Sequence, residues 1–207
     1  MIDIKNLTIN YDKKVIDDIS FAIEPGKVHV LMGRNGAGKS SILNAISGLI
    51  SYDGNIRADG KISYLNQNVN TKVNFTVFET IILGKVKSLN FKLSDEDIND
   101  TYEIMDLLKL RKFENKKISK MSGGEVQKVL IAQALISKPD ILLLDEPVNA
   151  LDLHNQYEIL AIIKKLTQKL NLTTLITLHQ MELIERYADN IILINNNKIY
   201  EVGDKYQ

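Results

Sequence analysis

The stretch Gly33-Arg34-Asn35-Gly36-Ala37-Gly38-Lys39-Ser40 decides the fold of this chain. It matches the pattern G-x-x-x-x-G-K-[ST], in which glycines let the backbone curl until its N–H groups face phosphate oxygens. The apolar run Val28–Met32 comes directly before it and predicts a strand, while Ile42, Leu43 and Ile46 follow it at helical spacing. Because a strand before and a helix after are the context that this pattern requires, the stretch predicts a phosphate-binding loop rather than a glycine-rich turn that matches by chance.

Two side chains of this loop have separate expected roles. Lys39 reaches the outer phosphates of a nucleotide as a point charge, and the Ser40 hydroxyl is a ligand for Mg²⁺. The helix that begins near Gly38 adds the positive end of its dipole to the same site. The residues expected to bind the nucleotide are Gly33, Arg34, Asn35, Gly36, Ala37, Gly38, Lys39, Ser40 and Ser41.

Strand and helix patterns alternate around this loop. Residues 2–10 alternate apolar and polar side chains, as a half-buried strand does, and residues 15–23 and 61–65 also suit strands. Beyond residue 120, helical patterns at 126–135, 155–170 and 181–187 alternate with strand patterns at 141–144, 173–177 and 190–194, and a hairpin closes at 198–202. This order predicts an α/β fold whose mostly parallel sheet is covered by helices.

The region between residues 75 and 120 has a different, helical pattern. Ser94-Asp95-Glu96-Asp97 suits a capping-box helix start, and Ile98, Tyr102, Met105 and Leu108 follow at helical spacing. Strands resume after this region. We therefore expect one domain over residues 1–207, with a helical insertion over about residues 75–135.

Composition narrows the classes of protein that this chain could be. It has 207 residues, with 26 Lys and Arg against 26 Asp and Glu, and this balance does not indicate a general basic face for nucleic acid. The absence of cysteine excludes disulfides and thiolate metal sites. No apolar run approaches the ~20 residues needed to span a bilayer, and the first residues lack the apolar run of a signal peptide. We expect any membrane role to depend on a partner.

A second motif ends the predicted strand Ile141–Leu144, where Asp145 and Glu146 follow. Open α/β sheets bind ligands at the carboxyl ends of their strands, so Asp145 is placed to orient the Mg²⁺ shell and Glu146 to polarise an attacking water. The alternative interpretation is an apolar strand that ends in a surface carboxylate pair. The phosphate-binding loop in the same chain favours the first interpretation.

A third motif, Met121-Ser122-Gly123-Gly124-Glu125, precedes the predicted helix 126–135. A serine and two glycines at a helix N-terminus suit a second anion site, although an ordinary N-cap has the same residues. The chain would then have two anion sites, each at the start of a helix. The two sites need not bind the same nucleotide within one chain.

Together these motifs resemble the ATP-binding cassette of ABC transporters. Gly33–Ser40 resembles its Walker A motif, Ile141–Asp145 its Walker B motif with Glu146 at the catalytic glutamate, and Met121–Glu125 its LSGGQ signature. Four further positions match in order and spacing: Gln67 of the Q-loop, Asp152 of the D-loop, the switch histidine His179, and Tyr11 as the aromatic residue that stacks on adenine. In isolation Gln67 and His179 would be ordinary residues, and Tyr11 could plug the edge of a small sheet.

The resemblance implies a P-loop NTPase fold with a small antiparallel β-subdomain, and an ATPase that binds ATP and Mg²⁺. The implied catalytic residues are Glu146, His179 and Gln67, and the implied Mg²⁺ ligands are Ser40, Gln67 and Asp145. Two cassettes, expected to be copies of this chain, would pack head to tail, with each ATP on the Walker A motif of one. Ser122, Gly123, Gly124 and Asp152 of the other cassette would complete that site.

Three features depart from the family's pattern. Glu125 ends the signature and adds negative charge near a phosphate site, although similar cassettes carry this residue. The stretch between Lys39 and Gln67 is shorter than usual, which implies a trimmed β-subdomain. The chain stops soon after Gly203, so no C-terminal regulatory domain is expected.

Further segments resemble particular importers. Phe75–Thr80, Leu151–Gln156 and Leu178-His179-Gln180 resemble the cassettes of iron-chelate, haem and cobalamin importers, and Gly60–Tyr64 resembles those of zinc and manganese importers. The resemblance implies ATP-driven import of a metal ion or metal chelate. It also implies membrane permease subunits, a separate substrate-binding protein, and a peripheral location on the cytoplasmic face of the membrane.

Other classes of cassette compete with this interpretation. A soluble cassette, such as one for iron–sulfur assembly, or a cassette of an exporter would share the ATP motifs. Translation-type members carry two cassettes in one chain, and repair-type members carry long coiled coils, whereas this chain has one cassette and no sustained heptads. A degenerate regulatory subunit is disfavoured because every catalytic position is filled.

Overall fold

A computed structural model describes residues 1–66, 74–88 and 93–204 of the chain. The chain forms two compact units. The first holds Met1–Gln67, Asp140–Pro147 and Ile163–Gln207, and the second holds Asn68–Pro139 and Val148–Ile162.

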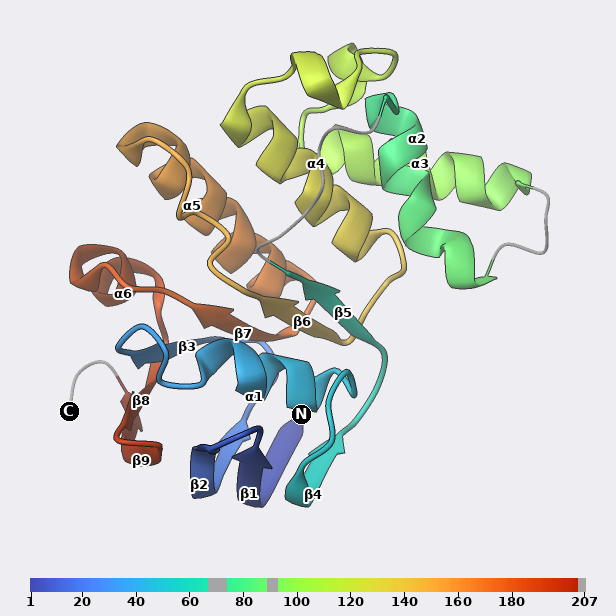
Figure 1. The fold of residues 1–207 in the computed structure, drawn as a ribbon. Helices are drawn as coiled ribbons and strands as arrows, with labels where there is room; N and C mark the ends of the chain where they lie inside the picture. Colours follow the sequence, from blue (N-terminus) through green and yellow to red (C-terminus); the bar gives the residue numbers. More distant parts are fainter. Residues whose placement is uncertain (67–73, 89–92, 205–207) are drawn as a thin grey trace. The chain divides into compact units, whose positions relative to one another are not determined.

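A six-stranded sheet is the centre of the first unit (Figure 1). Its order is β5 (Ile62–Leu65), β6 (Ile141–Leu144), β7 (Thr173–Thr177), β3 (Val28–Gly33), β8 (Asn190–Asn195) and β9 (Lys198–Asp204). Neighbouring strands are parallel except for β9, which pairs antiparallel with β8. Every residue of β6 and β7 is buried, as expected for parallel strands covered on both faces.

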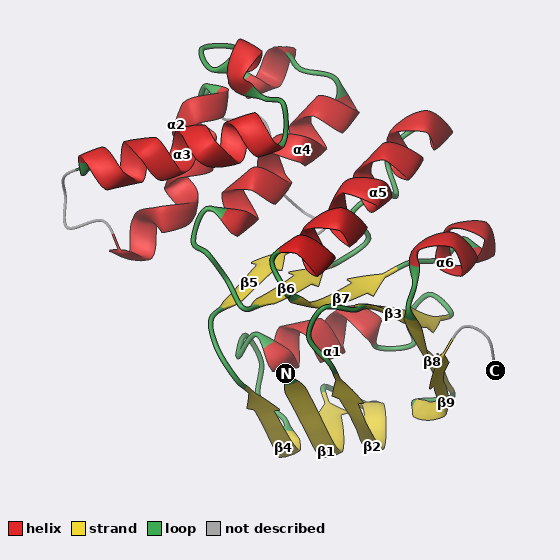
Figure 2. Ribbon diagram, turned by 180° about the vertical axis from the view of Figure 1, so that it is seen from behind, coloured by secondary structure: helices red, strands yellow, loops and turns green. Residues whose placement is uncertain are grey.

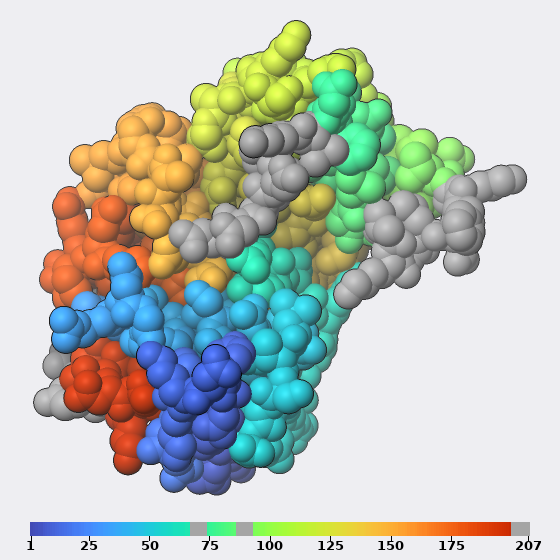
Figure 3. Space-filling view, in the orientation of Figure 1, coloured from blue at the N-terminus to red at the C-terminus, as the bar shows by residue number. Residues whose placement is uncertain are grey.

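A second, three-stranded sheet in the same unit is antiparallel, with the order β2 (Lys14–Ile23), β1 (Ile2–Asn10) and β4 (Asp53–Ala58). In the space-filling view these strands form one continuous surface, blue for β1 and β2 and cyan for β4 (Figure 3). Ile2, Ile4, Leu7 and Ile9 bury their side chains, while polar residues of β1 are more exposed. The predicted antiparallel β-subdomain is therefore confirmed.

Helix α1 (Lys39–Ile46) lies between the two sheets (Figure 2). Its buried residues Ile42 and Leu43 belong to one apolar core with Ile4 of β1 and Leu143 of β6. The helix therefore packs against a sheet on each of two sides. Its N-terminus lies at the carboxyl end of β3, which is the element before it in the chain. Helix α6 (Met181–Tyr187) lies on the opposite face of the six-stranded sheet.

The second unit is helical, as predicted for the insertion. It contains α2 (Val77–Ile82), α3 (Asp95–Leu107), α4 (Gly123–Leu135) and three 3₁₀ helices, at Leu83–Ser88, Arg111–Phe113 and Ile118–Lys120. Helix α5 (Leu153–Lys169) is divided between the two units: residues 153–162 belong to the second unit, and residues 163–169 belong to the first unit. The predicted capping box at Ser94 and Asp97 is present at the start of α3.

Most predicted strand limits differ from the observed limits by one or two residues at most, but α4 begins three residues before the predicted position. The reason is a capping box. The Ser122 side chain accepts a hydrogen bond from the Glu125 N–H, which brings Gly123 and Gly124 into the first turn despite their low helix propensity.

Candidate active site

The loop between β3 and α1 is shaped by two glycines in left-handed conformations, Gly36 at φ +79° and Gly38 at φ +93°. A Cβ on Gly38 would lie 2.7 Å from Cδ1 of Ile16 and 2.9 Å from Cγ1 of Val15. Only glycine fits there without strain. Because Gly38 is the N-cap and has no side chain to bond the first turn, α1 leaves its leading N–H groups for a ligand.

Lys39 lies across this loop with only 6% of its surface exposed. Its Nζ donates to the carbonyl oxygen of Gly33 at 2.9 Å and to that of Arg34 at 3.1 Å. Burial lowers the pKa of Lys39, while the charges of Glu146 and Asp145 act in the opposite direction. The ammonium is thus held over the loop by carbonyls that an anion can replace.

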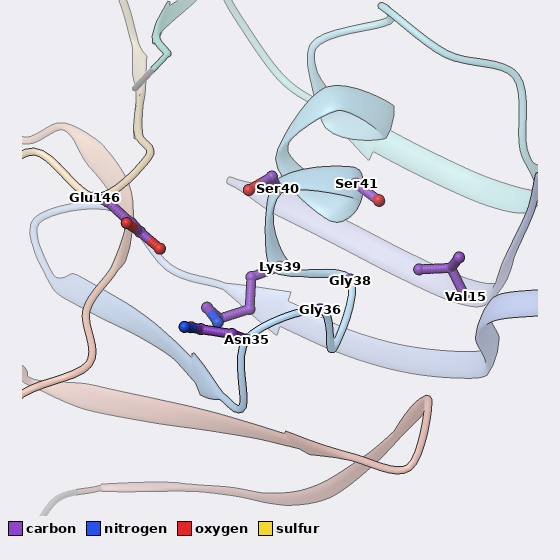
Figure 4. A pocket seen from close by; sticks show the side chains of 8 residues that line it. All are labelled: Val15, Asn35, Gly36, Gly38, Lys39, Ser40, Ser41 and Glu146. Carbon is purple, nitrogen blue, oxygen red and sulfur yellow. The ribbon is translucent and has the colours of Figure 1, made fainter. Parts of the chain in front are cut away.

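A pocket of about 390 Å³ opens above the loop (Figure 4), within the size range of small-molecule sites. Its lining residues come from β2, the loop, α1 and the end of β6. They are Val15, Asn35, Gly36, Gly38, Lys39, Ser40, Ser41 and Glu146. The Glu146 carboxylate points towards the Lys39 side of the pocket. The arrangement brings one ammonium, two hydroxyls and one carboxylate around a single space.

Asp145 follows β6 and is 4% exposed. Its Oδ1 accepts a hydrogen bond from Oγ1 of Thr177 at 2.8 Å, and its Oδ2 accepts a longer one from the Tyr64 hydroxyl at 3.5 Å. Burial, together with the Asp145 charge, raises the pKa of Tyr64, so this hydroxyl keeps its proton. Two hydroxyls, from the strands on either side of β6, therefore contact the two oxygens of this carboxylate.

Glu146 has a left-handed backbone, with φ +48°, and its N–H donates to Oγ1 of Thr177 at 2.7 Å. Its Oε1 lies 2.5 Å from Nε2 of His179, in the loop after β7. Such a contact orients the Glu146 carboxylate. The structure thus brings together Glu146 and His179, which are 33 residues apart in the chain.

The residues around this pocket fit a nucleotide and Mg²⁺. The uncapped N-terminus of α1 and the Lys39 ammonium suit phosphates, and the Ser40 hydroxyl is a hard oxygen donor of the kind that Mg²⁺ prefers. The Asp145 carboxylate is a second such donor; it precedes the lining residue Glu146 but does not itself line the pocket. Tyr11 lies in the loop after β1, 55% exposed, and is not one of the residues that line the pocket. Gln67 lies outside the described residues.

The signature-like motif lies in the second unit, at the start of α4. Oε2 of Glu125 accepts from the Ser122 N–H at 3.0 Å and pairs with Nζ of Lys116 at 3.3 Å. The Ser122 hydrogen bond, aided by Lys116, lowers the pKa of Glu125. The negative charge that Glu125 adds here is therefore hydrogen-bonded to the N-cap residue Ser122 and partly neutralised by Lys116.

The two glycines of this motif pack against the segment that carries Asp152. A Cβ on Gly124 would lie 2.2 Å from Oδ1 of Asn155, and one on Gly123 would lie 3.2 Å from Cδ2 of Leu151. Asn155 donates its backbone N–H and its side-chain amide to the Asp152 carboxylate. Close packing against α5 thus gives a structural reason for glycine at position 124.

Sequence reasoning missed three residues of the site. Val15 lines the pocket, and Thr177 and Tyr64 contact Asp145. The sequence did contain a signal for Thr177, because it is a polar residue at the end of an apolar strand, two positions before His179. No local pattern links Tyr64 to Asp145, since they are 81 residues apart.

The family model of ABC transporters matches residues 16–149 of the chain. An uncharacterised ABC transporter ATP-binding protein of Methanocaldococcus jannaschii is 34% identical, over 93% of this chain and 81% of that protein. A petrobactin import ATP-binding protein of Bacillus subtilis is 30% identical, over 98% and 86% of the two chains. A zinc import ATP-binding protein of Anaplasma marginale is 31% identical, over 93% and 78%.

Solved structures have the same fold. One is an inward-facing ABC transporter of the metal-chelate type, with a TM-score of 0.93 and 27% identity, over 99% of this chain and 83% of that chain. Another is a dimeric bacterial ABC transporter cassette, with a TM-score of 0.84 and 26% identity, over 99% of both chains.

Proposed function

The chain belongs to the ABC transporter family as an ATP-binding, ATP-hydrolysing subunit, and on that premise we propose that it powers the import of a metal ion or metal chelate. The observation that carries the assignment of the site is the pocket that joins Lys39, Ser40 and Glu146. The cargo is inferred from relatives whose names specify petrobactin and zinc import.

The loop residues 33–41 bind the phosphates of ATP in this proposal. Lys39 exchanges the carbonyls of Gly33 and Arg34 for phosphate oxygens, which are stronger acceptors because they are charged. The N–H groups at the start of α1 bind the same phosphates. Tyr11 stacks on the adenine ring, a role that its exposed position permits.

Mg²⁺, when bound with ATP, supplies charge neutralisation at the transferred phosphate. Ser40, Asp145 and Gln67 are the side chains proposed to hold it. Glu146 acts as the base that polarises the attacking water, and His179 orients the Glu146 carboxylate and contacts the γ-phosphate. Gln67 is the third proposed catalytic residue.

A second cassette completes each site. Ser122, Gly123 and Gly124 of the partner cassette bind the γ-phosphate from the far side, with Asp152 beside them. The dimeric bacterial cassette of the same fold supports the pairing of two cassettes. We infer a homodimer, because one chain carries both kinds of motif.

Permease subunits provide the path across the membrane in this proposal, and a separate binding protein delivers the cargo. Among the described residues, none of the helices is both long and apolar enough to cross a bilayer. The chain would then be held on the cytoplasmic face of the membrane by the permease.

The experiment that tests the cargo is transport by the assembled complex. The tagged chain is purified from a detergent extract of its native membranes, and the co-purifying complex is reconstituted in proteoliposomes. Uptake of radiolabelled iron–siderophore, haem, cobalamin, Zn²⁺ and Mn²⁺ is measured with ATP on the cassette side. We expect uptake of one of these compounds, abolished by Glu146→Gln. ATPase activity without uptake of any of them, or without a co-purifying membrane protein, would overturn the proposed cargo.

A further inference from the structure

We propose that Thr177 is a positioning residue for ATP hydrolysis, because its hydroxyl ties the Asp145 carboxylate to the backbone of Glu146. The inference rests on the proposed hydrolysis site and adds a residue to it. Thr177 is the last residue of β7 and is fully buried.

The hydroxyl of Thr177 makes two short hydrogen bonds at once. It accepts from the Glu146 N–H at 2.7 Å and donates to Oδ1 of Asp145 at 2.8 Å. A backbone N–H can only donate, so the single proton of the hydroxyl is left for the carboxylate. The direction of both bonds is therefore determined: Thr177 accepts from the Glu146 N–H and donates to the Asp145 carboxylate.

The backbone of Glu146 needs such support. Its φ of +48° is unfavourable for a residue with a Cβ, and left-handed residues of this kind persist where neighbours over-determine them. The bond to Thr177 holds the N–H at this turn, while His179 contacts the carboxylate of the same residue. The last residue of β7 and the loop that follows it thus contact Glu146 at two points, its backbone N–H and its carboxylate.

The Thr177 hydroxyl also restricts rotation of the Asp145 carboxylate. With Thr177 on Oδ1 and Tyr64 on Oδ2, rotation of the carboxylate would break at least one hydrogen bond. Second-layer groups of this type orient metal ligands, and their loss typically lowers affinity or activity by about 10–100-fold. Thr177 would thus keep a proposed Mg²⁺ ligand and the proposed base in one relative orientation.

A buried threonine on a central strand also has a purely structural interpretation, and β7 contains the control for it. Thr174 is on the same strand and is equally buried, and its hydroxyl bonds Oγ1 of Thr167 at 2.7 Å, away from Asp145 and Glu146. If Thr177 matters only for packing or strand stability, Thr177→Val and Thr174→Val should have similar effects.

The experiment compares the full-length wild type with Thr177→Val, Thr177→Ser and Thr174→Val. Three quantities are measured: kcat, KM for ATP, and ATP affinity by calorimetric titration with Mg²⁺ and with EDTA. For Thr177→Val we expect kcat to fall by about 10–100-fold, with a smaller rise in KM. Its affinity in EDTA should match the wild type, and its gain in affinity on adding Mg²⁺ should be smaller. Thr177→Ser should restore both, and Thr174→Val should resemble the wild type.

Two results would overturn the proposal. One is a Thr177→Val variant with the kcat and Mg²⁺ gain of Thr174→Val, and the other is a Thr177→Ser variant as impaired as Thr177→Val. If the valine variant does not fold, the Ser and Ala variants at position 177 repeat the comparison, because they differ only by the hydroxyl. A wild type that neither binds nor hydrolyses ATP contradicts the proposed function itself, which separates the two failures.

Discussion

The Lys39 ammonium has hydrogen-bond partners within its own loop, and the proposed function has it exchange them for the phosphates of ATP. Lys39 is nearly buried, and these partners are two carbonyls of the loop. Replacing it by alanine leaves the backbone cradle intact but removes the point charge on the phosphates. We predict that Lys39→Ala weakens ATP binding by at least about tenfold, since hydrogen bonds to charged groups contribute about 1.5–3 kcal/mol. Fluorescence titration with a labelled nucleotide measures this, and unchanged affinity would contradict the role of the loop.

His29 is a residue whose titration should affect folding. It is 1% exposed on β3, and its Nε2 accepts a hydrogen bond from the Glu24 N–H at 3.2 Å. Burial lowers its pKa, the charges of Glu24 and Asp189 raise it, and Lys27 lowers it, with burial dominant. Because the folded state disfavours the proton, this contribution to stability is complete above the ordinary pKa of 6.5 and is lost as pH falls through the folded pKa.

We therefore predict that the wild type loses stability between pH 7.5 and pH 5.5, by up to about 1.4 kcal/mol, because pH 5.5 lies one unit below the ordinary pKa of 6.5. His29→Gln should have a flatter profile, because its amide does not titrate. Urea unfolding at several pH values measures this. His154→Gln, at an exposed histidine, is the control and should keep the wild-type slope. Equal slopes for all three proteins would contradict the prediction.

At the scale of elements, an ion-pair cluster in the second unit joins the 3₁₀ helix Leu83–Ser88 to α3. Nζ of Lys85 lies 2.8 Å from Oδ1 of Asp97 and 2.5 Å from Oδ2 of Asp100, and the Lys85 side chain is 11% exposed. Lys138 also pairs with Asp100, at 2.8 Å, but its side chain is 68% exposed. The Lys85 hydrogen bond, with those of Ser94, lowers the pKa of Asp97.

We predict that Lys85→Met raises amide hydrogen exchange in α3 by about tenfold or more, because it leaves two carboxylates in a poorly solvated position. Lys138→Met is the control and should change exchange little, since exposed pairs contribute little. The effect of Lys85→Met should shrink at low pH, because stabilisation by Asp97 is lost as pH falls through its lowered pKa. Equal effects of the two substitutions would refute this role of Lys85.

At the scale of the whole molecule, the proposed site is shared between two chains. Lys39→Ala breaks the half that binds the outer phosphates. Ser122→Asp keeps an N-cap on α4 but adds a negative charge where the partner's phosphate is expected. Each variant alone should be inactive. In an equal mixture, half of the dimers are mixed, and each has one intact site.

We predict that the mixture recovers up to about a quarter of wild-type ATPase activity, as expected for random exchange in a twofold dimer. Steady-state phosphate release measures the recovery. Ser122→Asn, which caps α4 without the charge, is the control and should retain more activity than Ser122→Asp. A mixture no more active than the sum of its parts would argue against a shared site.

The sequence by itself determined the local parts of this protein. The loop Gly33–Ser40 could be predicted because its glycines, its lysine and its flanking periodicities are adjacent in the chain. The strands Ile141–Leu144 and Thr173–Thr177 and the helix Met181–Tyr187 have the predicted limits, since their apolar patterns are sharply bounded. The family's motifs then indicated Glu146 and His179, but not how they meet.

Only the tertiary structure decided which side chains surround the two carboxylates. Leu144 pairs with Leu65 on one side and Ile176 on the other, so Tyr64 and Thr177 arrive beside Asp145 from opposite strands. That register depends on the packing of buried strands far apart in sequence, and no local pattern contains it. The hydroxyl of Thr177, unremarkable in the sequence, therefore becomes the link between Asp145 and Glu146 only in the folded sheet.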